Sequence, residues 1–215
     1  MIQILRVLAR KTGLNRIIYK FIYGDDYEKN FDQAILKFCH KGSVIFDVGA
    51  NRGHYISKFI EKGAVVYAFE PDPLNYSSLQ REFSHFSNVH LINAAIGSET
   101  GKVYFQSKPE NEGVNSAISA AGDLHIQCYA LDDFCRENSL VPDIVKVDVE
   151  GHELEVLEGS KSILKETKLV AVEIHNEVLN GRGVGKPNDV VRKALMKAGF
   201  STRFTDFSHI IGYRL

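Results

Sequence analysis

The residues with the clearest chemical potential form a short glycine-containing segment, Asp-Val-Gly-Ala-Asn-Arg-Gly, at positions 47–53. The segment follows an apolar run typical of a buried strand and precedes a helical pattern. Gly49 therefore permits a tight exit from the strand, and Gly53 permits the helix start to approach a ligand closely. The Gly-x-x-x-Gly spacing differs from that of dinucleotide enzymes and of phosphate-binding loops. Alone, such a turn is structural in many α/β proteins.

Glu70 favours a ligand-binding interpretation of this turn. It ends the next predicted strand, 17 residues after Gly53, and precedes Pro71. A carboxylate in this place can accept hydrogen bonds from both hydroxyls of a ribose. The alternative is a solvated loop acid, which the position beside a glycine turn makes less favourable. We therefore predict a nucleoside-binding site.

A second group of polar residues stands at the ends of two later, otherwise apolar strands. Asp148 ends one of them, and Glu173 with His175 ends the other. Glu173 and His175 are two residues apart, so we expect both on one face of the strand. Charges in apolar strands cost free energy unless they are paired or used. An ion pair between Lys146 and Glu173 is the structural alternative to a catalytic role.

The elements that must position these groups alternate between strand and helix after residue 43. We predict strands at 43–48, 65–69, 89–92, 143–148, 169–174, 200–204 and 209–213, and helices at 53–62, 74–86, 153–164 and 189–198. Nearly continuous apolar strands alternating with helices indicate an α/β fold with a mostly parallel sheet covered on both faces. The last two strands predict an antiparallel hairpin.

The spacing of apolar residues divides the chain into two parts. Residues 1–42 are predicted to form a helical segment that packs on the core, and residues 43–215 to form the main domain. The stretch at about 98–131 does not fit the alternation. It predicts an insertion over the carboxyl edge of the sheet, where ligands bind in such folds.

Composition limits the classes of function. Of the 215 residues, 26 are basic and 27 acidic, so no overall positive field favours nucleic acid as a partner. The three cysteines are widely spaced and form no zinc-ligand pattern, which indicates free thiols in a reducing compartment. Neither a signal-peptide core nor an apolar run of about 20 residues occurs. We therefore expect a soluble cytoplasmic protein.

Five motifs, taken together and in this order, resemble those of FkbM-type methyltransferases. They are Asp-Val-Gly-Ala-Asn-Arg-Gly at 47–53, Phe-Glu-Pro at 69–71, Asn-Ala-Ala-Ile-Gly at 93–97, Lys-Val-Asp-Val-Glu-Gly-His-Glu at 146–153 and Val-Glu-Ile-His at 172–175. This family consists of S-adenosylmethionine-dependent class I enzymes, which commonly methylate hydroxyls of sugars or other natural products. The resemblance covers roughly residues 44–176. It implies a Rossmann-like sandwich with a seven-stranded sheet and a C-terminal antiparallel hairpin.

The resemblance also implies which residues hold the methionine part of S-adenosylmethionine. Gly49, Ala50, Asn51 and Gly53 would wrap around it, and Asp47 would hold its ammonium group through the loop. The product S-adenosylhomocysteine would occupy the same positions.

The nucleoside part would lie against the ends of the next strands. Glu70 would accept the ribose hydroxyls, and the backbone at Asn93, Ala94 and Ala95 would meet the adenine edge. Close packing is the structural alternative for the two alanines. Asp148 would complete the cofactor site beside the reactive end.

Methyl transfer from a sulfonium is an in-line displacement, so the enzyme must align the acceptor oxygen and remove its proton. We predict His175 as the base, Asp148 as a base or acceptor-orienting group, and Glu173 as a further member of the catalytic group. A less favoured alternative has Asp148, Glu150, Glu173 and His175 converging on a divalent metal ion such as Mg²⁺. Nearby, we expect Glu153 to favour a positive helix end and His152 to lie at the surface.

The expected partner is a small-molecule or glycan acceptor. The polar loop at 107–123 and the glycine-rich turn at 180–185 are candidates to border it, with ordinary surface loops as the alternative. Residues 1–24 are basic and lack acidic residues. We favour a helix packed on the domain there, with peripheral membrane contact as the alternative. A homo-oligomer is left open.

Two other classes of function compete with a methyltransferase. One is a nucleotide-binding oxidoreductase on a related fold, which the glycine spacing opposes. The other is a non-catalytic module that retains the cofactor site. Methylation at nitrogen is less favoured, because no Asn/Asp-Pro-Pro-Tyr/Phe motif occurs.

Overall fold

The computed structural model of the protein describes residues 27–106, 117–118 and 124–214. The basic segment predicted at 1–24 and most of the loop predicted at 107–123 lie outside the described residues. Within the described ranges, no helix combines the length and the apolar character that a membrane crossing requires.

The main sheet has seven strands in the order β10-β11-β9-β8-β1-β2-β3. They are β1 (Val44–Val48), β2 (Val65–Phe69), β3 (Val89–Ile92), β8 (Ile144–Val147), β9 (Leu169–Glu173), β10 (Ser201–Phe204) and β11 (His209–Tyr213). Six strands run in the same direction, and β11 alone is reversed, antiparallel to both β9 and β10. The α/β class, the mostly parallel sheet and the C-terminal hairpin are therefore confirmed.

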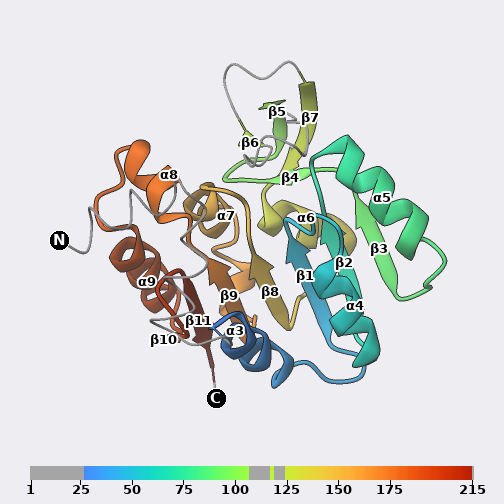
Figure 1. Cartoon of the computed structure of the whole chain (residues 1–215), viewed down its shortest axis with the longest axis horizontal. Helices are drawn as coiled ribbons and strands as arrows, with labels where there is room; N and C mark the ends of the chain where they lie inside the picture. The colour runs from blue at the N-terminus through green and yellow to red at the C-terminus, as the bar shows by residue number, and fades with distance from the viewer. Residues whose placement is uncertain (1–26, 107–116, 119–123, 215) are drawn as a thin grey trace.

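Helices cover both faces of this sheet (Figure 1). They are α3 (Tyr27–Leu36), α4 (His54–Glu61), α5 (Pro73–Phe83), α6 (Leu131–Asn138), α7 (Glu153–Glu158), α8 (Asn176–Gly181) and α9 (Pro187–Lys197), with a 3-10 turn at Ile163–Lys165. Successive strand residues serve opposite layers. Ile45 packs in the core with α3, α4 and α5, whereas Phe46 packs in the core with α6 to α9.

The stretch that breaks the alternation forms a separate four-stranded sheet. Its strands are β4 (Ala95–Ile96), β5 (Gly101–Gln106), β6 (Ala117–Ile118) and β7 (Leu124–Tyr129), in the order β4-β7-β5-β6. A small core of its own contains Phe105, Ile126 and Cys128. Figure 1 shows this sheet at the top of the molecule, beyond the arrowheads of β8 and β1.

Three helical features differ from the prediction. Helix α6 was not predicted, although Leu131, Phe134 and Cys135 are buried at helical spacing. Helix α8, which begins at Asn176, was not predicted either, and it overlaps only the start of the turn expected at 180–185. The helix predicted at 153–164 ends instead at Glu158. The next residue is Gly159, where a side chain would overlap the main-chain oxygen of Gly97 at the start of the small sheet.

Candidate functional site

The glycine turn after β1 lies directly against the end of β8. Gly49 has φ +79°, and a Cβ there would overlap the main-chain oxygen of Asp148. Its N–H and that of Ala50 both donate to the oxygen of Phe69, at 3.0 Å each. A glycine is thus required at this position because the ends of three strands meet there.

Gly53 serves the packing of two helices, and its predicted contact with the cofactor stays a prediction. Its φ is +82°, and a Cβ would overlap the ring of Phe83 in α5. The missing side chain therefore lets α4 begin against α5. The N–H of Gly53 donates to the oxygen of Ala50 at 2.8 Å, which closes the turn.

Glu70 connects the end of β2 to the glycine turn. Its Oε2 accepts the N–H of Asn51 at 2.7 Å, and its Oε1 accepts the N–H of Asp72 at 2.8 Å. The residue is 5% exposed. Burial raises the pKa of its carboxyl to about 7, against the opposing effect of these two hydrogen bonds. Each carboxylate oxygen has a second acceptor position, so the group retains capacity for hydroxyl donors.

Asp47 lies beneath the turn and faces Lys146. The two residues are register partners on β1 and β8, and Lys146 Nζ lies 3.1 Å from Asp47 Oδ1. Asp47 is fully buried. Its predicted role, to hold the ammonium group of the methionine part through the loop, stays a prediction, and any such effect is indirect because the side chain packs beneath the turn. It acts on the turn through Lys146, which donates to the oxygen of Gly49 at 3.0 Å.

Lys146 and Glu173 do not form the ion pair that was the structural alternative, although the charge of Glu173 helps to raise the pKa of Lys146. Within 4 Å, Lys146 pairs with Asp47 and, at 3.4 Å, with Asp148 Oδ2. Burial opposes the charge of Lys146, but Asp47 and Asp148 outweigh it and keep its pKa above the ordinary value. The ammonium group thus links the glycine turn to the end of β8.

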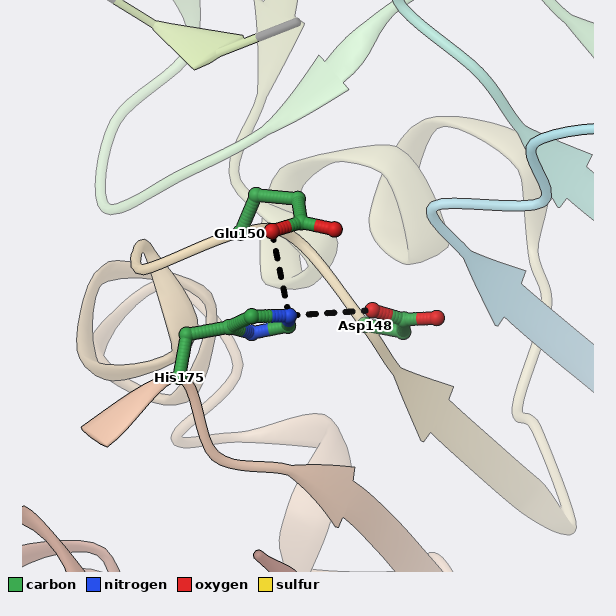
Figure 2. A group of neighbouring side chains, drawn as sticks. All are labelled: Asp148, Glu150 and His175. Atoms are coloured by element: carbon green, nitrogen blue, oxygen red, sulfur yellow. Dashed lines mark ion pairs between the residues drawn. The ribbon is translucent and has the colours of Figure 1, made fainter. Parts of the chain in front are cut away.

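His175 lies between carboxylates at both of its ring nitrogens. Figure 2 shows the two at Nε2, from Asp148 and Glu150. Nδ1 is 2.6 Å from Glu153 Oε1, and Nε2 is 3.1 Å from Glu150 Oε2 and 3.8 Å from Asp148 Oδ1. Burial lowers the pKa of the imidazole, but Glu150 and Glu153 outweigh it and raise the pKa to about 11. Both ring nitrogens thus face carboxylate oxygens, and the role of His175 as the base stays a prediction.

Glu173 is separated from this group, so the expected shared face of Glu173 and His175 is wrong. Strand β9 ends at Glu173, and His175 is the N-cap residue of α8 with φ −82° and ψ 70°. Glu173 Oε2 lies instead 3.4 Å from Nε2 of His209, whose Nδ1 lies 2.8 Å from Asp206. Burial opposes the charge of His209, but Asp206 and Glu173 raise its pKa to about 9.

Glu153 is the residue that sequence reasoning missed. It is fully buried, and its Oε1 accepts the N–H of Gly151 at 2.9 Å in addition to facing His175. A side chain at Gly151, φ +97°, would overlap that of Val178 in α8. The turn therefore packs against α8, which directs Glu153 inward. The available signal was the run Glu-Gly-His-Glu at 150–153, whose glycine indicates a tight turn. His152, expected at the surface, is half-buried.

Asn93 ties the ends of β2 and β3 together. Its side-chain Nδ2 donates to the oxygens of Glu70 at 2.8 Å and Pro71 at 3.2 Å. Ala94 and Ala95 are buried, and Ala95 belongs to β4. The two alanines thus pack closely, and the contact of their main chain with the adenine edge stays a prediction.

Comparisons with known proteins agree on one class. A family model described as "Methyltransferase FkbM domain" matches residues 47–211. Hexuronic acid methyltransferase AglP of Haloferax volcanii is 31% identical over 193 residues, covering 87% of this chain and 77% of AglP. The 2-O-methyltransferase NoeI of Sinorhizobium fredii is 25% identical over 157 residues, covering 63% of this chain and 65% of NoeI.

The fold also matches solved structures. Magnesium protoporphyrin IX methyltransferase (ChlM) from Synechocystis PCC 6803, with bound S-adenosylmethionine, superposes with a TM-score of 0.52. The alignment covers 99% of this chain and 96% of that one at 15% identity. At this identity the likeness concerns the fold alone.

Proposed function

The chain belongs to the FkbM-domain methyltransferases, and on that premise we propose that it transfers a methyl group to a hydroxyl of a saccharide or similar hydroxylated small molecule. S-adenosylmethionine is the methyl donor, and S-adenosylhomocysteine is the product. The acceptor class and the role of each site residue are the parts that need a test.

One observation carries this proposal: Glu70 and the glycine turn are joined at the edge where β1, β2 and β8 end. The 2.7 Å hydrogen bond from Asn51 to Glu70 couples the proposed methionine-binding turn to the proposed ribose-binding carboxylate. Asp148 contacts the same turn through its main chain. A cofactor placed along this edge would direct its reactive end toward Asp148.

We assign the cofactor-binding roles accordingly. The turn of Gly49, Ala50 and Asn51 would surround the methionine part, with Asp47 supporting the turn from beneath. Glu70 would accept the ribose hydroxyls at its remaining acceptor positions. Asn93 would hold the backbone of residues 70–71 in place for this purpose, with the main chain of residues 93–95 at the adenine edge.

Asp148 is the best-placed group to receive the acceptor. Its side chain is 27% exposed and its main chain contacts the glycine turn, whereas Glu153 is fully buried and Glu173 contacts His209. In the reaction, the acceptor oxygen forms a bond to the methyl carbon while the bond between that carbon and sulfur breaks. The electron pair of the broken carbon–sulfur bond remains on sulfur. The hydroxyl proton passes to the Asp148 carboxylate. A group in this role contributes ~100- to 10,000-fold to turnover.

The acceptor class rests on the relatives. AglP is named for hexuronic acid and NoeI for a 2-O position, so both names indicate oxygen of a sugar-like compound. The four-stranded sheet stands beyond the strand ends, on the side where the proposed acceptor would enter (Figure 1).

Calorimetric titration with S-adenosylhomocysteine, with NAD⁺ as the control ligand, tests the cofactor assignment. We expect micromolar affinity for the former, none for NAD⁺, and weaker binding by Glu70→Ala. Tritium transfer from labelled S-adenosylmethionine to glucuronic acid glycosides and to matched glucosides then tests the acceptor. Transfer to an amine and to neither sugar would contradict the proposal.

A further inference from the structure

The geometry around His175 goes beyond what the proposed reaction uses. Side-chain ligand atoms of Asp148, Glu150 and His175 all lie within 4.8 Å of one another. Two chain segments supply them, one after β8 and one after β9, and Figure 2 shows the three side chains converging. Ligand atoms of two types, carboxylate oxygen and imidazole nitrogen, thus converge on one place.

We propose that Asp148, Glu150 and His175 bind a divalent transition-metal ion, which holds the hydroxyl oxygen of the acceptor. The role in holding the acceptor rests on the proposed function, whereas the binding of the ion does not. Glu173, which was among the four residues of the sequence-based alternative, is excluded because it contacts His209.

The distances suit such an ion with little rearrangement. Two ligand atoms bonded at about 2.1 Å and at right angles lie about 3.0 Å apart. His175 Nε2 is 3.1 Å from Glu150 Oε2 and 3.8 Å from Asp148 Oδ1. Asp148 and Glu150 are 27% and 28% exposed, so the remaining coordination positions face solvent. Three protein ligands with open positions are typical of catalytic metal sites.

Glu153 supplies an independent observation. A histidine that binds a metal ion usually donates its other ring N–H to a carboxylate, which fixes the tautomer. Glu153 Oε1 lies 2.6 Å from Nδ1 of His175, which would leave Nε2 as the ligand atom. Glu153 is fully buried, and its Oε2 has no hydrogen-bond partner among the described residues. A buried carboxylate so poorly solvated requires positive charge close by.

The donor set indicates the class of ion. Carboxylates suit Mg²⁺, Ca²⁺ and Mn²⁺, whereas imidazole suits transition metals, so a set of both favours ions such as Mn²⁺, Fe²⁺ or Zn²⁺. Three carboxylates meet one imidazole here, and Lys146, which also contacts Asp148, is paired with Asp47. Negative charge therefore predominates, as a dication requires.

Such an ion would address the main chemical difficulty of the reaction. A carboxyl group has an ordinary pKa of about 3.9, whereas that of bulk water is about 15.7, and an aliphatic hydroxyl is similarly weak. Coordination lowers the pKa of a bound oxygen by several units. The proton can then leave to the Asp148 oxygen that does not face the ion, and from there to water.

Manganese binding to the full chain, after treatment with a chelator, tests the site without any need for turnover. The electron paramagnetic resonance signal of free Mn²⁺ measures the bound fraction. We expect one saturable Mn²⁺ per chain and at least tenfold weaker binding by Glu150→Gln and by His175→Gln. Glu173→Gln is the matched control, a carboxylate that also faces a histidine, and should bind Mn²⁺ within twofold of the unmodified chain.

Two further measurements separate the possible failures. Glu153→Gln should weaken Mn²⁺ binding about 10- to 100-fold, as loss of an outer-shell partner does. Titration of each variant with S-adenosylhomocysteine shows that it has folded. A chain that binds S-adenosylhomocysteine but no Mn²⁺, or variants that all bind Mn²⁺ equally, would overturn the metal site and leave the proposed function intact. Mn²⁺ binding without S-adenosylhomocysteine binding would support the site and count against the function.

Discussion

Two histidines near the end of β9 are each held between carboxylates, and the difference between them separates a structural unit from a candidate catalytic one. His209 faces Asp206 and Glu173, and the ring of Phe31 in α3 lies 4.4 Å from its own, centroid to centroid. His175 faces Glu153 and Glu150. The two histidines have similar carboxylate partners but differ in the residues around them.

The His175 group differs from the His209 group in its number of carboxylates and in its contact with the glycine turn. Asp148 adds a third carboxylate, and the main chain of Asp148 contacts the glycine turn. The side chain of His175 is 16% exposed, whereas that of His209 is 7% exposed and lies against an aromatic ring. A carboxylate–histidine–carboxylate unit is thus a candidate for catalysis when it lies beside the proposed cofactor site, as at His175. Away from that site, as at His209, it joins two elements of the fold.

The largest effect should follow from Asp148→Asn, because it removes the proposed proton acceptor. We expect turnover to fall ~100- to 10,000-fold, while S-adenosylhomocysteine affinity stays within a few-fold of the unmodified chain. Steady-state kinetics and calorimetry measure the two quantities. A parallel loss of both would place Asp148 in the cofactor site alone.

His209→Asn should instead lower stability, with a defined pH dependence. The folded pKa of His209, about 9, is above its ordinary value of 6.5. Its contribution to the free energy of unfolding is therefore fully present below pH 6.5 and is lost as the pH rises through 9. The shift corresponds to about 3 kcal/mol.

Urea unfolding of this variant and of the unmodified chain at pH 6 and pH 10 checks the prediction. The difference in stability should be large at pH 6 and small at pH 10. His85→Asn, at an exposed position, is the matched control. A difference that does not change with pH would assign the His209 contribution to packing against Phe31.

The two carboxylates that face Nε2 of each histidine allow a direct comparison. We expect Glu150→Gln to reduce turnover about 10- to 100-fold, since Glu150 belongs to the proposed ligand set. Glu173→Gln should leave turnover within twofold and lower stability by about 1 kcal/mol. Kinetics and urea unfolding of both variants provide the test. A large loss of turnover in Glu173→Gln would restore Glu173 to the catalytic group.

The smallest effect concerns Glu70, whose pH dependence has the opposite sign to that of His209. Only the ionised carboxylate can accept both ribose hydroxyls, and the pKa of Glu70 is raised to about 7. Affinity for S-adenosylhomocysteine should therefore fall up to about tenfold as the pH drops from 8 to 6. Calorimetry at both pH values measures this change, which should be absent in Glu70→Gln. The same slope in that variant would mean that another group titrates.

Much of the fold could be predicted because the local spacing of apolar residues indicated correctly whether a segment forms a strand or a helix. Apolar runs such as 65–69 and 169–173 become buried parallel strands, and the two late strands pair as the predicted hairpin. Helix α6 was missed because acidic residues at 132–133 conceal a short apolar face. Helix boundaries such as the end of α7 depend on contacts with the small sheet. A local sequence pattern does not predict them, because the residues in contact are far apart in the sequence.

The sequence by itself determined the family, the place of the glycine turn and the strand ends beside Glu70 and Asp148. Tertiary structure alone decided which charges meet. Strand register brought Lys146 opposite Asp47, and the tight turn at Gly151 directed Glu153 inward to His175. Strand β9 ends at Glu173, whose carboxylate contacts His209. Ion pairing acts over a few ångströms, whereas sequence pattern specifies a side chain's element and face but not the partner that folding brings within reach.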